Sequence, residues 1–175
     1  MTSYGSEKGN VLYLVVCAAP PVRDSERLIV QMQGLGWDVC VVTTPAARIW
    51  IDAKRLANTS GHVLRTQFRG PDDPAFEPLG DAVLVAPATF NTINQVAAGI
   101  NDSLALGLVN EALGSQVPTV FVPCLGDGLP LHPAYLASVR LLAGAGALFL
   151  DGLGAEEVAV VADQALRLPR TAAEA

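Results

Sequence analysis

Three short polar side chains follow an apolar stretch near the middle of the chain: Thr89, Asn91 and Thr92. The stretch Val83–Ala86 has the composition of a buried strand, and Pro87 ends it. Hydroxyl and amide groups at such a point cap a helix whose first N–H groups have no partner inside the helix. Free N–H groups and the helix dipole favour a bound anion. The spacing therefore predicts a phosphate site or, alternatively, an ordinary helix cap without a ligand.

The same residues resemble the signature of a known family. Pro87-Ala-Thr-Phe-Asn-Thr92, followed by Gly99-Ile-Asn-Asp102, is similar to the Pro-Ala-Ser-Ala-Asn-Thr and Gly-x-x-Asp segments of the homo-oligomeric flavin-containing cysteine decarboxylases. That family includes phosphopantothenoylcysteine decarboxylases and the peptidyl-cysteine decarboxylases of lanthipeptide biosynthesis, and the resemblance extends from Val11 to Leu150. It implies FMN as the cofactor, with its phosphate at Thr89, Phe90, Asn91 and Thr92. Thr89 keeps the hydroxyl of the signature, whereas Phe90 replaces a small residue.

The resemblance also implies cofactor contacts outside this turn. Three residues at the end of the first predicted strand, Cys17–Ala19, match a Gly-Ser-apolar triplet of the family. Thr43 matches a threonine after the second strand, and Cys124 matches a small residue in a Pro-Ala-Met-Asn segment. The additional contacts implied are Cys17, Ala18, Ala19, Thr43, Pro87 and Cys124. Loss of the Gly-Ser pair removes a hydroxyl and a flexible backbone position. Phosphate binding would then depend more heavily on Thr89–Thr92.

The part of the family pattern that faces the substrate is altered. In the family a histidine shortly before the fourth strand acts as an acid/base, but no histidine lies within residues 70–80 and the matching position is Asp73. Gly126 ends the segment that corresponds to Pro-Ala-Met-Asn, so it replaces the Asn that holds the substrate carboxylate in the family. The segment that would close over the substrate is reduced to Asp151-Gly-Leu-Gly154.

Two residues are candidates for the missing proton transfer, Asp73 and His62. A neutral imidazole is suited to proton transfer near pH 7, although His62 can also be read as a partly exposed loop residue. Asp73 would need a pKa raised by burial, for example at a subunit contact, and is otherwise part of a solvated turn. His132, which precedes Pro133, is expected to cap a helix.

Apolar strands alternate with helical stretches, which predicts a Rossmann-like α/β fold. We expect a three-layer, doubly wound parallel sheet of about six strands with helices on both faces. The predicted strands are Val11–Val16, Trp37–Thr43, Val63–Phe68, Asp81–Ala86, Thr119–Pro123 and Ala147–Leu150. The predicted helices are Arg23–Gln33, Ala46–Lys54, Asn91–Leu113, His132–Ala143 and Ala155–Leu166. Residues 10–168 are expected to form a single domain between flexible ends at 1–9 and 169–175.

Composition narrows the classes of partner. The net charge of −6 and the lack of a Lys/Arg cluster argue against binding to nucleic acid or to an anionic membrane. Met1 is followed by polar residues and the longest apolar runs are too short to span a bilayer, so we expect a cytoplasmic protein. The three cysteines and two histidines show no disulfide or metal-binding spacing. The family resemblance, together with a mean hydropathy of +0.38, suggests a homo-oligomer, a trimer or a multiple of trimers.

Three functions stay open at this point. The first is an FMN-dependent enzyme with redox or decarboxylase-like chemistry on a small or peptide-borne thiol substrate. The second is a flavin-binding carrier or regulatory subunit without decarboxylase activity. The third is a flavin-free scaffold that binds another phosphorylated ligand.

Overall fold

The chain alternates strands and helices along most of its length. The computed structural model describes residues 10–70, 72 and 80–168, so Asp73 and both ends predicted to be flexible lie outside the described residues. The strands are β1 (Asn10–Val16), β2 (Trp37–Thr43), β3 (Ala82–Ala88), β4 (Thr119–Pro123) and β5 (Leu148–Phe149). The α-helices are α1 (Ser25–Gly34), α2 (Ala53–Ser60), α3 (Phe90–Ala97), α4 (Leu104–Gly114), α5 (Pro133–Gly144) and α6 (Val158–Leu166). Two 3-10 helices follow the first two strands, η1 (Pro20–Asp24) and η2 (Pro45–Ile49).

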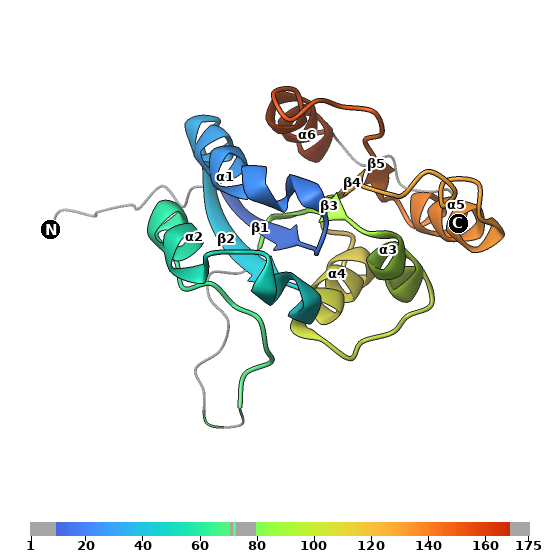
Figure 1. The fold of residues 1–175 in the computed structure, drawn as a ribbon, viewed down its shortest axis with the longest axis horizontal. Helices are drawn as coiled ribbons and strands as arrows, with labels where there is room; N and C mark the ends of the chain where they lie inside the picture. Colours follow the sequence, from blue (N-terminus) through green and yellow to red (C-terminus); the bar gives the residue numbers. More distant parts are fainter. Residues whose placement is uncertain (1–9, 71, 73–79, 169–175) are drawn as a thin grey trace, which may run out of the picture.

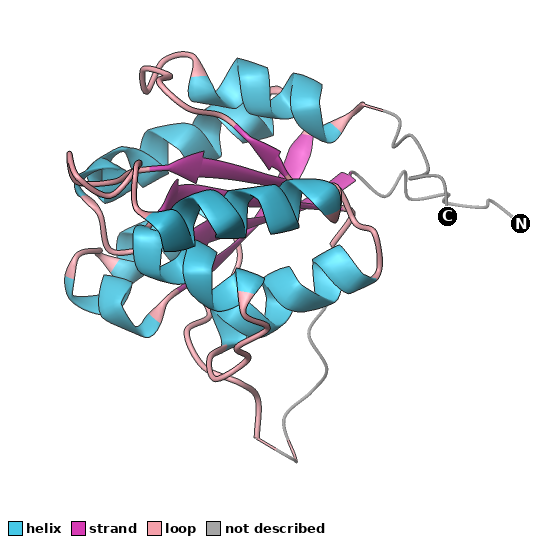
Figure 2. Ribbon diagram, turned by 90° about the vertical axis from the view of Figure 1, so that its right-hand side faces the viewer, coloured by secondary structure: helices cyan, strands magenta, loops and turns pink. Residues whose placement is uncertain are grey.

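The five strands form one parallel sheet in the order β2-β1-β3-β4-β5. Figure 1 shows α1 and α6 on one face of this sheet and α3 and α4 on the other. Figure 2, which is turned by 90°, shows the strands enclosed between the two helical layers. The predicted Rossmann-like, three-layer α/β fold is therefore confirmed, with five strands in the described part of the chain.

Both faces of the central strands are buried, which explains their continuous apolar sequence. In β1, Leu12 and Leu14 pack into a cluster with residues of α1 and α6. The alternating residues Val11, Tyr13 and Val15 pack into a second cluster with residues of α3, α4 and α5. A parallel sheet covered in this way leaves its carboxyl edge as the natural place for a ligand. No helix in the described residues is long and apolar enough to cross a membrane.

The prediction of a strand at Val63–Phe68 was wrong. Only Arg65 makes a bridge there, to Val42 at the edge of the sheet. Its backbone exchanges two hydrogen bonds with β2, from Arg65 N–H to the Val41 carbonyl and from Thr43 N–H to the Arg65 carbonyl. Val63 is 79% exposed and Phe68 is 52% exposed, whereas Leu64 is partly buried against the core cluster that contains Leu12.

Two predicted helices were also wrong, because each is interrupted in the structure. The stretch Asn91–Leu113 is divided into α3 and α4, because Gly99 adopts a left-handed conformation with φ of 69° and Ser103 then caps the second helix. The stretch Ala46–Lys54 is divided into η2 and the first residues of α2, which is capped by Asp52 through the Arg55 N–H. Local apolar periodicity did not reveal either interruption.

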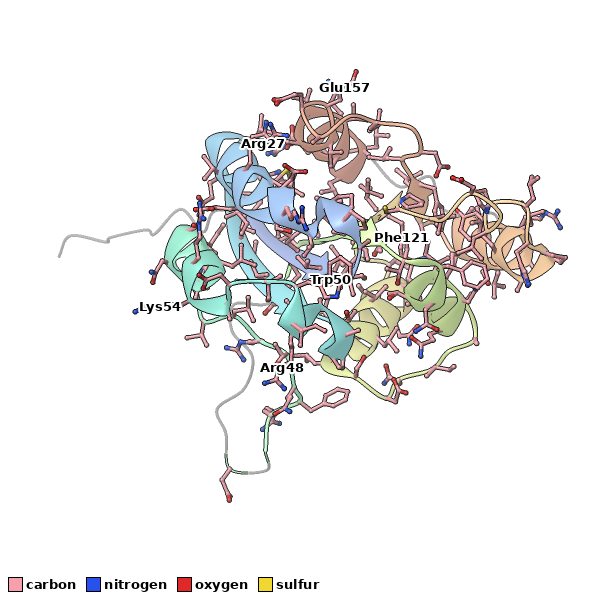
Figure 3. The ribbon with its side chains drawn as sticks, in the orientation of Figure 1. Arg27, Arg48, Trp50, Lys54, Phe121 and Glu157 are labelled. Carbon is pink, nitrogen blue, oxygen red and sulfur yellow. The ribbon has the colours of Figure 1, made fainter. Side chains whose placement is uncertain are left out.

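Among the described residues, Phe121 has the largest side chain that is completely buried. Its ring is stacked on that of Phe149, with ring centroids 5.0 Å apart, and Figure 3 places it in the interior beside the sheet. We expect Phe121→Ala to lower the free energy of unfolding by about 3–5 kcal/mol, because it creates a cavity in the core. Phe149→Ala should cost less, because Phe149 is only partly buried. Urea unfolding measures both; an equal or smaller loss for Phe121→Ala would contradict this packing.

Candidate functional site

A cavity of about 470 Å³, most of whose lining residues carry hydroxyl, amide or carboxylate groups, opens beside the ends of β1, β2 and β3. We call it the threonine cavity, because three of its lining residues are threonines. It is lined by Ala18, Thr44, Pro45, Ala46, Thr89, Asn91, Thr92, Gln95, Asp102, Ser103 and Leu106. Hydroxyl and amide side chains thus gather where α3 and α4 begin.

Thr89 determines the geometry of this cavity. It has extended backbone angles, φ −83° and ψ 157°, and its hydroxyl accepts a hydrogen bond from the Thr92 N–H at 3.3 Å. The two hydroxyl oxygens lie 3.0 Å apart. Because Thr89 is the N-cap of α3, the unpaired N–H groups of the first helical turn and the positive end of the helix dipole point toward the cavity. This arrangement can hold an anion without a cationic side chain.

Asp102 is the charged side chain among the residues that line the threonine cavity. A carboxylate repels an anion but accepts hydrogen bonds from hydroxyl groups. Gln95 lies on the same wall and already accepts a hydrogen bond from the Asn91 amide at 3.2 Å. The cavity therefore combines donors for an anion at Thr89 and Thr92 with acceptors for hydroxyl groups elsewhere, a pattern suited to a phosphorylated polyol.

A second cavity of about 400 Å³ lies on the other face of the sheet, between α1 and α6. We call it the α1–α6 cavity. Most of its walls are apolar, and they are formed by Pro21, Asp24, Ser25, Leu28, Ala86, Pro87, Val122, Pro123, Cys124, Leu125, Gly152, Leu153, Ala155 and Val158. Ser25 is 1% exposed, and its hydroxyl has no hydrogen-bond partner among the described residues. The cavity can accommodate a flat, mainly apolar group.

The two cavities flank one turn of the chain. Ala18 lines the threonine cavity, and Ala19 is buried directly before η1, whose Pro21 lines the α1–α6 cavity. At the end of β3, Pro87 lines the α1–α6 cavity and Thr89, two positions later, lines the threonine cavity. The two cavities are therefore separated by short segments of the chain with small residues at 18 and 19.

Comparison with known proteins identifies the family. A profile of the family described as Flavoprotein matches residues 2–166 of this chain. The chain belongs to the Flavoprotein family. The family indicated by the sequence around Thr89 is thereby confirmed.

Sequence relatives of this Flavoprotein member include decarboxylases and a reductase. The "Probable phosphopantothenoylcysteine decarboxylase" of Streptococcus mutans is 30% identical over 118 residues, which make up 64% of this chain and 65% of that protein. A cysteine/cysteine sulfinic acid decarboxylase from an unknown prokaryotic organism is 33% identical over 97 residues, 52% of this chain and 26% of that protein. A dihydromethanopterin reductase of Methanosarcina mazei is 46% identical over 81 residues, 42% of this chain and 34% of that protein. The chain thus spans less than two thirds of the length of these relatives.

Solved structures show the same fold. The FMN-dependent cysteine decarboxylase TvaF of thioviridamide biosynthesis matches with a TM-score of 0.76 at 20% identity, over 90% of this chain and 98% of that one. A phosphopantothenoylcysteine decarboxylase variant complexed with pantothenoylaminoethenethiol also has a TM-score of 0.76, at 14% identity and with 90% and 98% of the two chains covered. At these identities the likeness extends to the fold alone.

The structure brings most of the predicted cofactor contacts to the two cavities. Ala18, Thr89, Asn91 and Thr92 line the threonine cavity. Pro87 and Cys124 line the α1–α6 cavity, and the Cys124 N–H is bonded to the Ala88 carbonyl at 2.9 Å. The peptide bond between Ala86 and Pro87 is cis.

Four predicted contacts take other positions. Thr43 is fully buried and its hydroxyl has no partner among the described residues, whereas its neighbour Thr44 lines the threonine cavity. Cys17 and Ala19 are buried and line neither cavity. Adjacent residues of an extended chain point to opposite sides, so Thr44 lines the cavity although its neighbour Thr43 does not. The sequence showed the two adjacent threonines but not which of them faces the cavity.

Phe90, the fourth of these residues, packs against α5 instead of lining a cavity. Its ring meets that of His132 edge-on at 5.3 Å and is stacked on Tyr135 at 6.4 Å. His132 caps α5 as expected, because its Nδ1 accepts a hydrogen bond from the Ala134 N–H at 3.1 Å. Phe90 thus fixes α3 to α5, which explains a large side chain at this position.

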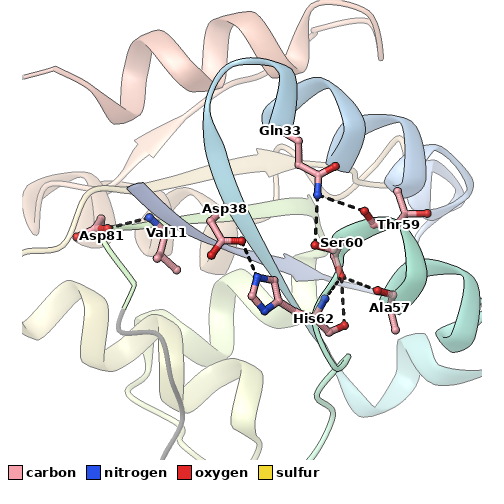
Figure 4. A network of polar contacts seen from close by, with 8 residues as sticks. All are labelled: Val11, Gln33, Asp38, Ala57, Thr59, Ser60, His62 and Asp81. Carbon is pink, nitrogen blue, oxygen red and sulfur yellow. Dashed lines mark hydrogen bonds and ion pairs between the residues drawn. The ribbon is translucent and has the colours of Figure 1, made fainter. Parts of the chain in front are cut away.

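His62 lies far from both cavities within one copy of the chain. Its Nε2 is 2.5 Å from a carboxylate oxygen of Asp38, near the amino end of β2, as Figure 4 shows. Its backbone N–H is bonded to the Ser60 hydroxyl, which joins the end of α2 to this pair. The cavities open at the carboxyl edge of the sheet, so His62 contacts neither of them in the same copy. The other predicted acid/base, Asp73, is outside the described residues.

Sequence reasoning did not identify Ser25, Gln95 and Ser103 as lining residues. Ser103 caps α4 through the Leu106 N–H, and Gln95 lies one helical turn after Asn91. The spacing of four between Asn91 and Gln95 was readable from the sequence, because such residues share a helix face. Ser25 gave no comparable signal, since its position depends on how α1 packs against α6.

Proposed function

We propose that the chain binds FMN, with the phosphate in the threonine cavity and the isoalloxazine ring in the α1–α6 cavity. The observation that carries this proposal is the pair of hydroxyls of Thr89 and Thr92 at the start of α3, where the first N–H groups have no partner within the helix. Membership of the Flavoprotein family supports it, as do neighbours in fold that are described as FMN-dependent.

The residues of the threonine cavity fit the phosphate and the ribityl chain. The helix start and the two threonine hydroxyls supply neutral donors for the phosphate oxygens. Asp102 and Gln95 can accept hydrogen bonds from the ribityl hydroxyls, which accounts for a carboxylate in a cavity that binds an anion. A free inorganic anion would gain nothing from Asp102, so the lining favours a hydroxylated phosphate ester.

The α1–α6 cavity fits the ring. Its volume of about 400 Å³ lies within the usual range for small-molecule sites, and its walls are mainly apolar. Pro87 and Pro123 offer rigid surfaces from adjacent strands, and Leu125 and Leu153 add apolar side chains to the lining. When bound, FMN supplies two-electron redox chemistry at its ring, while these residues orient the ring and exclude water.

Thr89 and Thr92 give the direct test of FMN binding. We expect Thr89→Ala combined with Thr92→Val to weaken FMN binding by about 1.5–3 kcal/mol, because the hydroxyl pair that donates a hydrogen bond to the charged phosphate is lost. Fluorescence titration of FMN measures the change. The matched control is Thr119→Val, a buried threonine at the amino end of β4 whose hydroxyl is bonded to the Val117 carbonyl. Unchanged FMN affinity in the double variant, or no FMN binding by the parent protein, would contradict the proposal.

The chemistry that follows binding depends on the residues beside the ring. In the described part of the chain, the ionisable side chains that line the two cavities are Asp24, Asp102 and Cys124. Gly126 is exposed and offers no side chain to a substrate carboxylate. These observations favour a flavoprotein that does not decarboxylate the thiol substrates of the cysteine decarboxylases efficiently. A flavin carrier, a regulatory subunit or a reductase of another small molecule is the alternative that they support.

We therefore expect little turnover of phosphopantothenoylcysteine or of a peptide that ends in cysteine. Acid/base groups contribute about 10²–10⁴-fold to a rate. The position that matches the acid/base histidine of the cysteine decarboxylases carries Asp73 in this chain. An anaerobic assay would follow carbon dioxide release and bleaching of the flavin together. Stoichiometric carbon dioxide with bleaching would overturn the expectation, and Asp73→Ala and His62→Ala would then identify the replacement acid/base.

We also propose that the chain associates with further copies of itself, as a trimer or a multiple of trimers. Ile49 is 90% exposed and Trp50 is 45% exposed, on the segment between β2 and α2. Arg48 lies on the same segment and Lys54 at the start of α2, both labelled in Figure 3, in a protein of net charge −6. Exposed apolar residues beside cations fit a contact with an acidic region of a second copy.

This surface predicts a defined change in assembly. Light scattering of the parent protein at micromolar concentration should show a trimer or a multiple of it. Ile49→Lys together with Trp50→Glu should shift the mass toward the monomer, because charges replace apolar contacts. Val160→Lys, a similar change at a 51% exposed residue of α6, should leave the mass unchanged. A monomeric parent protein would refute self-association.

A further inference from the structure

The α1–α6 cavity has two oxygen-bearing side chains in an otherwise apolar wall. They belong to adjacent residues, Asp24 and Ser25, where η1 ends and α1 begins. The other described residues of its lining are alanine, glycine, proline, leucine, valine and one cysteine. The Ser25 N–H is bonded to the Val22 carbonyl, which fixes the backbone at this junction. A polar group that enters the cavity therefore meets side-chain oxygens at the start of α1.

The hydroxyl of Ser25 is free to bind a ligand. Ser25 is 1% exposed, and its hydroxyl has no hydrogen-bond partner among the described residues. A buried hydroxyl without a partner costs free energy that a new hydrogen bond would recover. Rotation about the Cα–Cβ bond breaks no hydrogen bond of this hydroxyl, so it can turn toward a polar group placed in the cavity.

The carboxylate of Asp24 is also available. Asp24 is the N-cap residue of α1, but its side chain makes no capping hydrogen bond in the part of the chain that the structure describes. It lies 3.8 Å from the Arg27 guanidinium, which is beyond hydrogen-bond distance, and Arg27 is also paired with Glu156. The Asp24 side chain is 52% exposed, so a ligand at the mouth of the cavity can reach it.

A carboxylate beside a hydroxyl matches one kind of ligand edge. An ionised carboxylate only accepts hydrogen bonds, whereas a hydroxyl can donate one. An imide presents an N–H between two carbonyl groups, so its N–H can donate to the carboxylate while a carbonyl accepts from the hydroxyl. The pyrimidine edge of an isoalloxazine ring is such an imide. The opposite, dimethyl edge has no polar atom and suits the apolar lining at Leu125 and Leu153.

We propose that Asp24 and Ser25 orient the ring in the α1–α6 cavity by binding its imide edge. The N3–H of the ring donates to the Asp24 carboxylate, and the Ser25 hydroxyl donates to a flanking carbonyl. The inference rests on the proposed binding of FMN and goes further, because it specifies which edge of the ring faces α1. It also defines the class of ligand that this cavity selects, a flat heterocycle with an imide edge.

A flavin that is methylated at N3 tests the contact with Asp24. The compound 3-methyl-FMN keeps the phosphate, the ribityl chain and both carbonyl groups but has no N3–H. The parent protein should bind FMN about 10-fold more tightly than 3-methyl-FMN, because a hydrogen bond to a charged acceptor is lost. In Asp24→Ala this preference should fall below about threefold. Asp24→Asn keeps an acceptor oxygen and should retain most of the preference.

Asp102 provides the matched control for Asp24. It is the carboxylate that lines the threonine cavity, where the proposed function assigns it to the ribityl hydroxyls. Asp102→Ala should therefore weaken FMN and 3-methyl-FMN by the same factor and leave their ratio as it is in the parent protein. Fluorescence titration measures both affinities, after thermal unfolding has verified that each variant is folded.

Ser25→Ala tests the second contact. The affinity for FMN and for 3-methyl-FMN should fall by about 3–10-fold, the equivalent of one neutral hydrogen bond. Without flavin, the midpoint of thermal unfolding should stay the same or rise, because the hydroxyl has no partner to lose among the described residues. A merely structural serine would instead lower the unfolding temperature and leave flavin affinity unchanged.

The results separate this inference from the proposed function. A preference for FMN that is lost in Asp24→Ala, retained in Asp24→Asn and unaffected by Asp102→Ala supports the contact with the imide edge, as does weaker flavin binding by a stable Ser25→Ala. If the parent protein binds both flavins equally, or Asp24→Ala keeps the preference, the inference is overturned and FMN binding stands. If the parent protein does not bind FMN, the proposed function fails and the inference fails with it.

Discussion

The hydrogen bond from the Thr92 N–H to the Thr89 hydroxyl is the interaction on which the arrangement of the site depends. It ends β3 and begins α3, because the hydroxyl of an extended residue satisfies a donor that the helix itself cannot. With the helix start fixed there, Pro87 is left on one side of the chain and Thr89 on the other. The two cavities at the carboxyl edge of the sheet follow from that division.

The groups that would bind the anion in the proposed site are neutral. The protein has a net charge of −6, and the charged residue of the threonine cavity is Asp102. An anion is stabilised there by the dipole of α3, by the first N–H groups of the helix and by oriented hydroxyls. Orientation of the hydroxyl protons matters more in such a site than in one with an arginine or a lysine.

Local signals in the sequence predicted much of the fold and the centre of the site. The caps at Thr89 and His132 and five of the six predicted strands depend on residues close together in the chain, and the structure confirms them. Other features depend on contacts between distant segments. Phe90 reaches α5, His62 pairs with Asp38, and Val63 and Phe68 remain exposed although their composition is typical of a strand.

A crystal structure of the protein in complex with FMN tests the central claim most directly. The account predicts the phosphate within hydrogen-bond distance, roughly 2.7–3.2 Å, of the Thr89 hydroxyl and the first N–H groups of α3. It also predicts the isoalloxazine ring between Pro87 and Leu125 in the α1–α6 cavity of the same copy. A phosphate bound away from Thr89, or a ring outside the α1–α6 cavity, would contradict it.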